Sequence, residues 1–272
     1  MGTLYIVPTP IGNLEDITLR ALRILKEVAL IAAEDTRTSK TLLQHYDIPT
    51  PMTSYHEHNK LTKLETIFDT LAHADVALIS DAGTPGISDP GYELITAALE
   101  RGVNVVPLPG ATALIPALVG SGLPTDGFLY LGFFPKKAGT RRSVLEEIML
   151  ERRTLVAYES PYRLTETLAD VWEILGDRRV CVAREISKMF EQFFRGTIST
   201  ALVYYEQEPV RGEVVLVIAG ASDGDQLWDE KRVRAALLER VEAGESLSYA
   251  AKAVAKQSGW RKGDVYKVGI ED

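Results

Sequence analysis

The segment VALISDAGTPGISDPG, residues 76–91, decides the fold because it joins an apolar run to a loop rich in glycine and proline. Val76 to Ser80 has the length and composition of a buried strand. The glycines and prolines that follow are too many for a plain connector, and open α/β sheets bind ligands at the carboxyl ends of their strands. Asp81 could accept hydrogen bonds from an amino or hydroxyl group of a ligand. Tyr92 stands where a phosphate loop requires lysine, so nucleotide hydrolysis is not expected.

Short apolar runs alternate with helix-period segments on both sides of this stretch. We expect further strands at residues 4–7, 28–33 and 103–106, and helices at 18–27, 61–71 and 92–101. Alternation of this kind predicts a mostly parallel sheet covered by helices on both faces. Glycine and proline cluster at residues 120–124, so the first α/β domain is expected to span residues 1–120.

A second α/β domain is expected over residues 121–222. Its expected strands are 128–134, 155–158, 180–186, 190–195 and 214–219, and its expected helices are 141–151 and 164–175. After a polar linker, three helical stretches at 228–243, 247–258 and 261–268 make a small helical extension, residues 223–272. Ala255, Gly259 and Val265 have the spacing of a helix-turn-helix. Contact with nucleic acid and a plain helical cap both fit this extension.

The composition is that of an ordinary globular protein. Of the 272 residues, 46% are hydrophobic, and the formal net charge is −8. The single cysteine, Cys181, excludes an intramolecular disulfide and a multi-cysteine zinc site. No apolar run approaches the roughly 18 residues of a membrane helix, so we expect a cytoplasmic protein without a membrane partner. Residues 136–153 and 231–272 are locally basic, which fits either contact with a polyanion or solvated helix faces.

Two further loops follow predicted strands and also consist of small residues and prolines. They are PTPIGN, residues 8–13, and PLPGATA, residues 107–113. The first has one glycine, so the dinucleotide-binding fingerprint is absent. In the second, small residues allow a ligand to approach the backbone. Three such loops after three strands indicate one shared ligand crevice.

Charged residues gather at strand ends in the second domain, in YESPYR (158–163) and REISKMFE (184–191). They could serve a ligand site or form an internal ion-pair network, and both interpretations stay open. His56-Glu57-His58 lacks an apparent third ligand, so no metal site is expected. Cys181 lies in a predicted strand and is interpreted as a buried, inert thiol.

With these motifs the chain resembles the tetrapyrrole methylase family, over nearly all of residues 3–220. The motifs that carry the resemblance are VPTPIGNL (7–14), AEDTR (33–37), residues 80–91, PGA (109–111), ESPYR (159–163), and Arg184 and Glu185 with Lys188 and Glu191. Members that act on small tetrapyrroles usually carry a glycine-rich first loop. Prolines stand there in this chain, so the resemblance favours the branch that modifies ribosomal RNA.

The resemblance implies S-adenosylmethionine as the methyl donor, bound in a cleft between the two α/β domains of a homodimer. It also implies an acceptor, the 2′-hydroxyl of a cytidine ribose in the decoding centre of 16S ribosomal RNA, at the P site of the 30S subunit. Position for position, the residues that would contact the donor are Pro10, Asp81, Gly83, Ile87, Ala111, Thr112 and Ala113, with Tyr158, Ile186 and Gly212 from the second domain.

Charge clustering supplies the candidate catalytic residues. Glu159 and Glu191 are candidates for a base or an orienting group, because a ribose hydroxyl is a poor acid. Arg163, Arg184 and Lys188 are candidates to hold phosphate or to polarise the oxygen. Two other functions remain open: a methyltransferase for a small tetrapyrrole-like substrate, and a ligand-sensing regulator that binds DNA through residues 246–268.

Overall fold

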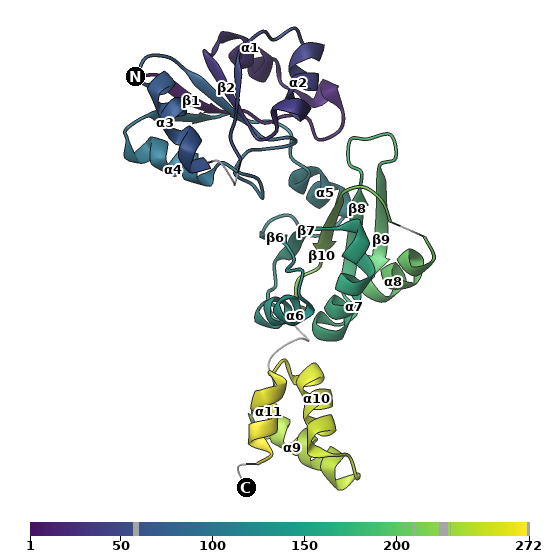
Figure 1. Cartoon of the computed structure of the whole chain (residues 1–272). Helices are drawn as coiled ribbons and strands as arrows, with labels where there is room; N and C mark the ends of the chain where they lie inside the picture. Colours follow the sequence, from purple (N-terminus) through teal and green to yellow (C-terminus); the bar gives the residue numbers. More distant parts are fainter. Residues whose placement is uncertain (57–59, 209, 223–227, 229, 271–272) are drawn as a thin grey trace. The chain divides into compact units, whose positions relative to one another are not determined.

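The computed structural model describes residues 1–56, 60–208, 210–222, 228 and 230–270 (Figure 1). The chain divides into two compact units. The first unit comprises Met1–Pro116 together with Glu185–Glu191, and the second comprises Ala117–Arg184 and Gln192–Asp272. No helix in the described part of the chain combines the length and the apolar character that a membrane span requires.

The first unit contains a five-stranded, wholly parallel sheet in the order β3-β2-β4-β1-β5. Its strands are β1 (Thr3–Ile6), β2 (Leu30–Ala33), β3 (Met52–Ser54), β4 (Val76–Ile79) and β5 (Asn104–Pro107). All four residues of β4 are buried, as expected for a central strand covered on both faces. The predicted parallel sheet is therefore confirmed.

Helices cover both faces of this sheet. They are α1 (Leu19–Glu27), α2 (Thr36–His45), α3 (Lys60–Leu71) and α4 (Tyr92–Glu100), with a short 3₁₀ turn η1 (Leu14–Asp16), and α5 (Leu114–Ser121) runs from the first unit into the second. Successive residues of a strand point to opposite faces of the sheet, and each face has its own hydrophobic core. Leu78 packs in one core and Ile79 in the other. Thr18 caps α1, since its side chain accepts a hydrogen bond from the Ala21 N–H.

The sheet of the second unit is mixed, in the order β6-β7-β10-β8-β9. Its strands are β6 (Phe128–Phe133), β7 (Thr154–Glu159), β8 (Arg179–Arg184), β9 (Gln192–Thr197) and β10 (Val214–Ile218). Only β6 and β7 pair in parallel; β10 lies antiparallel between β7 and β8, and β9 is antiparallel to β8. Cys181 is buried in β8 as expected, and burial raises the pKa of its thiol to about 11.

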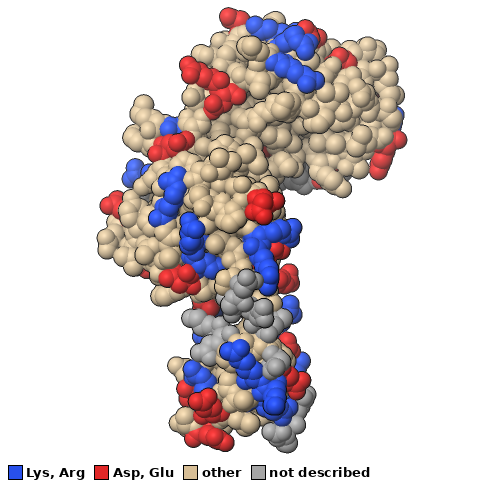
Figure 2. All heavy atoms as spheres, turned by 180° about the vertical axis from the view of Figure 1, so that it is seen from behind, with Lys and Arg blue, Asp and Glu red and all other residues tan. Residues whose placement is uncertain are grey.

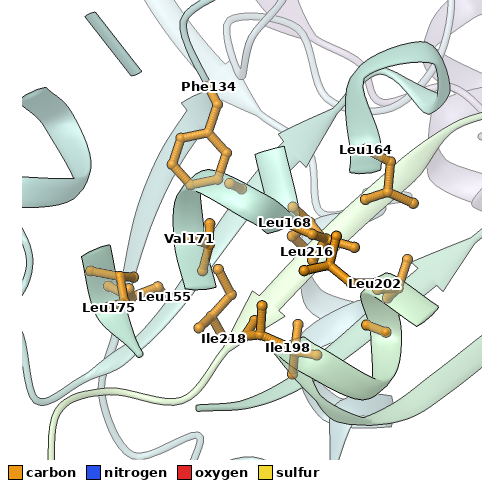
Figure 3. Packing of buried hydrophobic residues seen from close by; sticks show 14 of the residues in the cluster. Phe134, Leu155, Leu164, Leu168, Val171, Leu175, Ile198, Leu202, Leu216 and Ile218 are labelled. Atoms are coloured by element: carbon orange, nitrogen blue, oxygen red, sulfur yellow. The ribbon is translucent and has the colours of Figure 1, made fainter. Parts of the chain in front are cut away.

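Helices α6 (Ala138–Glu147), α7 (Leu164–Leu175) and α8 (Ile198–Gln207) and the 3₁₀ turn η2 (Pro161–Arg163) complete the sheet part of the second unit. Figure 3 shows side chains of α7, α8 and the strands meeting in its core, Leu168 and Leu216 among them. The basic stretch 136–153 is not one solvated face, because Arg141 is buried and forms an ion pair of 2.6 Å with Asp170 of α7.

Three C-terminal helices, α9 (Glu230–Glu242), α10 (Leu247–Ser258) and α11 (Lys262–Val268), confirm the predicted helical extension. They enclose a core of their own, which includes the buried Ala255 and Val265. Gly259 adopts the left-handed conformation (φ 73°) that the turn between α10 and α11 requires. Basic and acidic side chains both lie on the face of these helices seen in Figure 2.

Candidate functional site

Three loops of the first unit meet at one edge of its sheet: loop 1 (residues 8–13), loop 2 (80–91) and loop 3 (107–113). They follow β1, β4 and β5, which are neighbours in the sheet and run in parallel. Thr9 and Gly83 exchange two backbone hydrogen bonds of 2.9 Å, which join loop 1 to loop 2. The buried Thr9 hydroxyl donates a further bond of 3.1 Å to the Ser80 carbonyl. Loops 1 and 2 are thus one continuous structure.

Loop 3 is tied to both other loops. The Thr84 hydroxyl of loop 2 donates a hydrogen bond of 3.0 Å to the Ala111 carbonyl. Gly110 lies so close to loop 1 that a Cβ atom added to it would stand 2.6 Å from Cβ of Pro8. The predicted convergence of the three loops is therefore confirmed.

The structure brings together the predicted donor-binding residues of the first unit on these loops. Gly83 is buried with φ at 77°, a conformation that favours glycine. Pro10 and the run from Ala111 to Ala113 are partly buried, and Ile87 is 42% exposed. Alanine and threonine side chains at positions 111–113 are small, which suits close approach of a ligand.

A pocket of about 480 Å³ lies at the same sheet edge, at the ends of β2, β3 and β4. Its size is within the range of small-molecule sites, about 300–1,000 Å³. Its lining residues are Glu34, Asp35, Thr36, Arg37, Ser54, His56 and Asp81. Among the described residues, no group of three His, Cys, Asp or Glu side chains is placed to hold a metal ion. Residues 57 and 58 of the His-Glu-His motif lie outside the described residues.

The carboxylates of this pocket are interlocked and differ in acidity. Glu34 Oε2 accepts a hydrogen bond from the Asp81 N–H (3.3 Å), and Asp81 Oδ1 accepts one from the Asp35 N–H (3.1 Å). Burial raises the pKa values of Glu34 and Asp81, and neighbouring carboxylates add to both increases. Hydrogen bonds from the Arg37 side chain and backbone lower the pKa of Asp35 to about 2. The pocket is therefore acidic and suits a ligand with cationic or amino groups.

Glu34, Asp35 and Arg37 had no predicted role, although AEDTR was part of the resemblance. A signal was present: Glu34 follows the predicted strand 28–33 directly, as Asp81 follows 76–80. The rule that places ligands at the carboxyl ends of parallel strands would have assigned both to one edge.

In the second unit, Glu159 takes part in an internal ion pair, one of the two alternatives that the sequence allowed for the charged residues at these strand ends. Its side chain is fully buried, and Oε1 lies 2.7 Å from an Arg163 nitrogen and accepts a 2.6 Å bond from the Ser160 N–H. Oε2 accepts a 2.5 Å bond from the Thr167 hydroxyl. With both oxygens engaged, Glu159 is suited to orienting Arg163, which also donates a 3.4 Å bond to the Phe134 carbonyl.

The other candidates of residues 121–222 fall into two groups. Tyr158, Arg184 and Gly212 belong to the second unit, where Arg184 donates hydrogen bonds to Gln192 and to the Arg211 carbonyl. Ile186, Lys188 and Glu191 instead belong to the segment that packs with the first unit.

Comparisons with known proteins agree with this architecture. The family model of the tetrapyrrole (corrin/porphyrin) methylases matches residues 3–202. A ribosomal RNA small subunit methyltransferase I of Halalkalibacterium halodurans is 46% identical over 98% of this chain and 94% of its own length. The protein of the same name from Synechocystis is also 46% identical, over 100% of this chain and 98% of its own length.

One solved structure with a similar fold is a uroporphyrin-III C-methyltransferase of Thermus thermophilus, complexed with S-adenosyl homocysteine. It superposes with a TM-score of 0.56 at 22% identity, over 80% of this chain and 97% of its own. At this identity the structural similarity shows the fold alone. The family model and the full-length relatives show the family to which the chain belongs. The chain belongs to the tetrapyrrole methylase family.

Proposed function

We propose that this protein is an S-adenosylmethionine-dependent methyltransferase that modifies the 2′-hydroxyl of a cytidine ribose in the decoding centre of 16S ribosomal RNA. Loops 1, 2 and 3 converge beside an acidic pocket, and this observation supports a donor-binding site there. Full-length similarity to methyltransferases named for small-subunit ribosomal RNA supports the substrate class. The cytidine, its ribose and the P site rest on the motif resemblance.

The chemistry of the first unit fits the donor. S-adenosylmethionine carries a sulfonium and an ammonium group, and the carboxylate of Asp81 at the pocket edge offsets such charge. Small, partly buried residues from Ala111 to Ala113 allow a flat or extended ligand to approach the backbone. The proposal also assigns donor contacts to Tyr158, Ile186 and Gly212.

The donor supplies a methyl carbon that its sulfonium leaving group already activates, so no metal is required. In the transfer, the ribose oxygen forms a bond to that carbon, the carbon–sulfur bond breaks, and the sulfur keeps the electron pair. The protein has to align the two reactants, which can lower the barrier by about 7–11 kcal/mol, and to accept one proton.

The residues proposed to act on the ribose differ in the exposure and hydrogen bonding of their side chains. Glu191 is exposed and accepts a 2.8 Å bond from the Ser187 N–H, so one of its oxygens suits a base. The buried Glu159 is assigned to orienting Arg163. Arg163, Arg184 and Lys188 would hold phosphate or polarise the ribose oxygen.

We also propose a cytoplasmic homodimer that acts on the 30S subunit, with the C-terminal helices contributing to RNA contact. Sedimentation of the purified protein over a range of concentrations tests the dimer. Charge reversal at the exposed Arg261 and Lys262 should weaken binding to 30S subunits while leaving donor affinity unchanged.

The central experiment uses 30S subunits from a strain that lacks the modification. Donor binding is first measured by isothermal titration, and methyl transfer is then mapped by reverse transcription and by analysis of the modified nucleoside. We expect one 2′-O-methylcytidine per 30S subunit. Methylation of a base, or transfer to a tetrapyrrole and not to 30S subunits, would refute the proposal. Glu191→Gln with wild-type single-turnover rates would refute the role of Glu191 as a base.

A further inference from the structure

The loop between β8 and β9, Glu185–Glu191, ends in two exposed apolar side chains. Met189 is 91% exposed and Phe190 is 70% exposed. Although β8 and β9 belong to the second unit, this loop packs with the first unit. An apolar pair at a fixed loop tip has no role in the core, and the donor site proposed above does not use it.

The loop is anchored next to loop 1. The Ser187 hydroxyl donates a hydrogen bond to Oδ2 of Asp16, in the 3₁₀ turn that follows loop 1. The aliphatic part of Lys188 covers Gly12 so closely that a Cβ atom at Gly12 would stand 2.3 Å from Cγ of Lys188. The base of the loop is thus in contact with one of the three converging loops.

Internal contacts stabilise the loop on both sides of Met189 and Phe190. Lys188 Nζ lies 2.9 Å from Oε1 of Glu185, and the Lys188 N–H donates a 3.0 Å bond to the Glu185 carbonyl. Glu191 accepts a bond from the Ser187 N–H at one end of the turn. Glu185 and Ser187 adopt φ values of 51° and 69°, which side chains disfavour. Such conformations persist where surrounding contacts enforce them, and they concentrate at functional sites.

An exposed aromatic ring, on a loop that is anchored next to loop 1, matches the needs of RNA recognition. Proteins bind unpaired bases by stacking them on aromatic side chains. A target ribose can reach the donor only if its nucleotide is accessible, so neighbouring bases are unstacked and need a surface. The Glu185–Lys188 ion pair offsets the negative charge of Glu185, which would otherwise repel a phosphate backbone.

A second copy of this chain fits the tip less well. Stable interfaces bury about 800 Å² on each partner, whereas the tip offers two side chains, Met189 and Phe190. Stacking of one unpaired base, in contrast, requires only one aromatic ring, such as that of Phe190.

We propose that Phe190 stacks on an unpaired base of the RNA substrate next to the methylated nucleotide, and so positions the acceptor ribose. This inference rests on the proposed function, because it takes the substrate to be RNA. Phe190 acts through the base it holds and is a positioning residue.

The test compares Phe190→Ala and Phe190→Trp with a control, Leu99→Ala. Leu99 is 59% exposed at the end of α4, at the opposite edge of the sheet from the three loops. We expect Phe190→Ala to raise KM for unmodified 30S subunits about tenfold, since the base loses its stacking on an aromatic ring. Donor affinity and kcat at saturating 30S should change little. Phe190→Trp should keep the wild-type KM, and its added fluorescence should be quenched by 30S subunits.

The outcomes separate the two proposals. Failure of the wild-type protein to methylate 30S subunits would refute the proposed function. Wild-type transfer together with an unchanged KM in Phe190→Ala would refute only the stacking role. A change from dimer to monomer in Phe190→Ala, measured by sedimentation, would assign the tip to a contact between copies and also overturn the inference.

Discussion

Replacing Glu159 by Gln should destabilise the protein because it breaks a buried ion pair. The Glu159 side chain is fully buried and pairs with Arg163 at 2.7 Å. Removing one partner of a buried pair costs about 3–5 kcal/mol, because a buried charge is left uncompensated. Arg163 keeps 18% of its side chain exposed, so water relieves part of this cost. We expect a loss of about 3 kcal/mol in the free energy of unfolding.

The Thr167 hydroxyl donates a hydrogen bond to the other oxygen of Glu159. Removing that hydroxyl gives a second, independent measure of how much the buried Glu159 contributes to the free energy of unfolding. Thr167→Val removes one hydrogen bond to a charged group, and such bonds contribute about 1.5–3 kcal/mol. The matched control is Glu166→Gln, on the exposed face of the same helical turn, where we expect a change of at most about 0.5 kcal/mol.

The assay is urea denaturation followed by circular dichroism, combined with methyl-transfer kinetics on 30S subunits corrected for the folded fraction. If Glu159 orients Arg163, Glu159→Gln raises KM for 30S subunits and leaves the pH profile of kcat unchanged. Loss of a general base would instead lower kcat by about 10²–10⁴-fold. Wild-type stability together with such a loss of kcat would refute the argument from burial.

Three further predictions concern the first unit and the single thiol. Burial raises the pKa of Asp81, so its carboxylate becomes protonated at a higher pH than that of an ordinary aspartate, and donor affinity should fall as the pH decreases through this raised pKa. Asp81→Asn should bind the donor more weakly and lose this dependence in isothermal titration; a wild-type affinity that is flat with pH would contradict the assignment. Gly110→Ala places a methyl group against Pro8, so its midpoint of urea unfolding should correspond to a loss of about 1–3 kcal/mol. Its control is Gly139→Ala, in an open position of α6, where the midpoint should stay the same or rise, and equal midpoints for the two variants would rule out the steric argument. Cys181 should resist a thiol reagent at neutral pH in the folded protein and react once unfolded, because burial raises its pKa to about 11; rapid labelling of the native state would disprove this.

Several elements could not be predicted from local pattern. Helix α2 begins with the polar run from Thr36 to Thr41, whose residues are mostly weak helix formers, and it depends on its Asp35 cap and on two buried leucines. Strand β3 has three residues, none fully buried, and α8 lay in a stretch for which no element was expected. The mixed pairing of β10 also went unpredicted, because strand direction depends on partners distant in sequence.

The sequence by itself determined the alternation of strands and helices, the three loops after strands and the three C-terminal helices. These features follow from side-chain periodicity and from glycine and proline, which act over a few residues. Only the tertiary structure decided that Glu159 is buried in an ion-pair network, that Glu34 shares a pocket with Asp81, and that residues 185–191 pack with the first unit. Those outcomes depend on which charged groups lose their water and which partners replace it, and that is set by contacts between residues far apart in the chain.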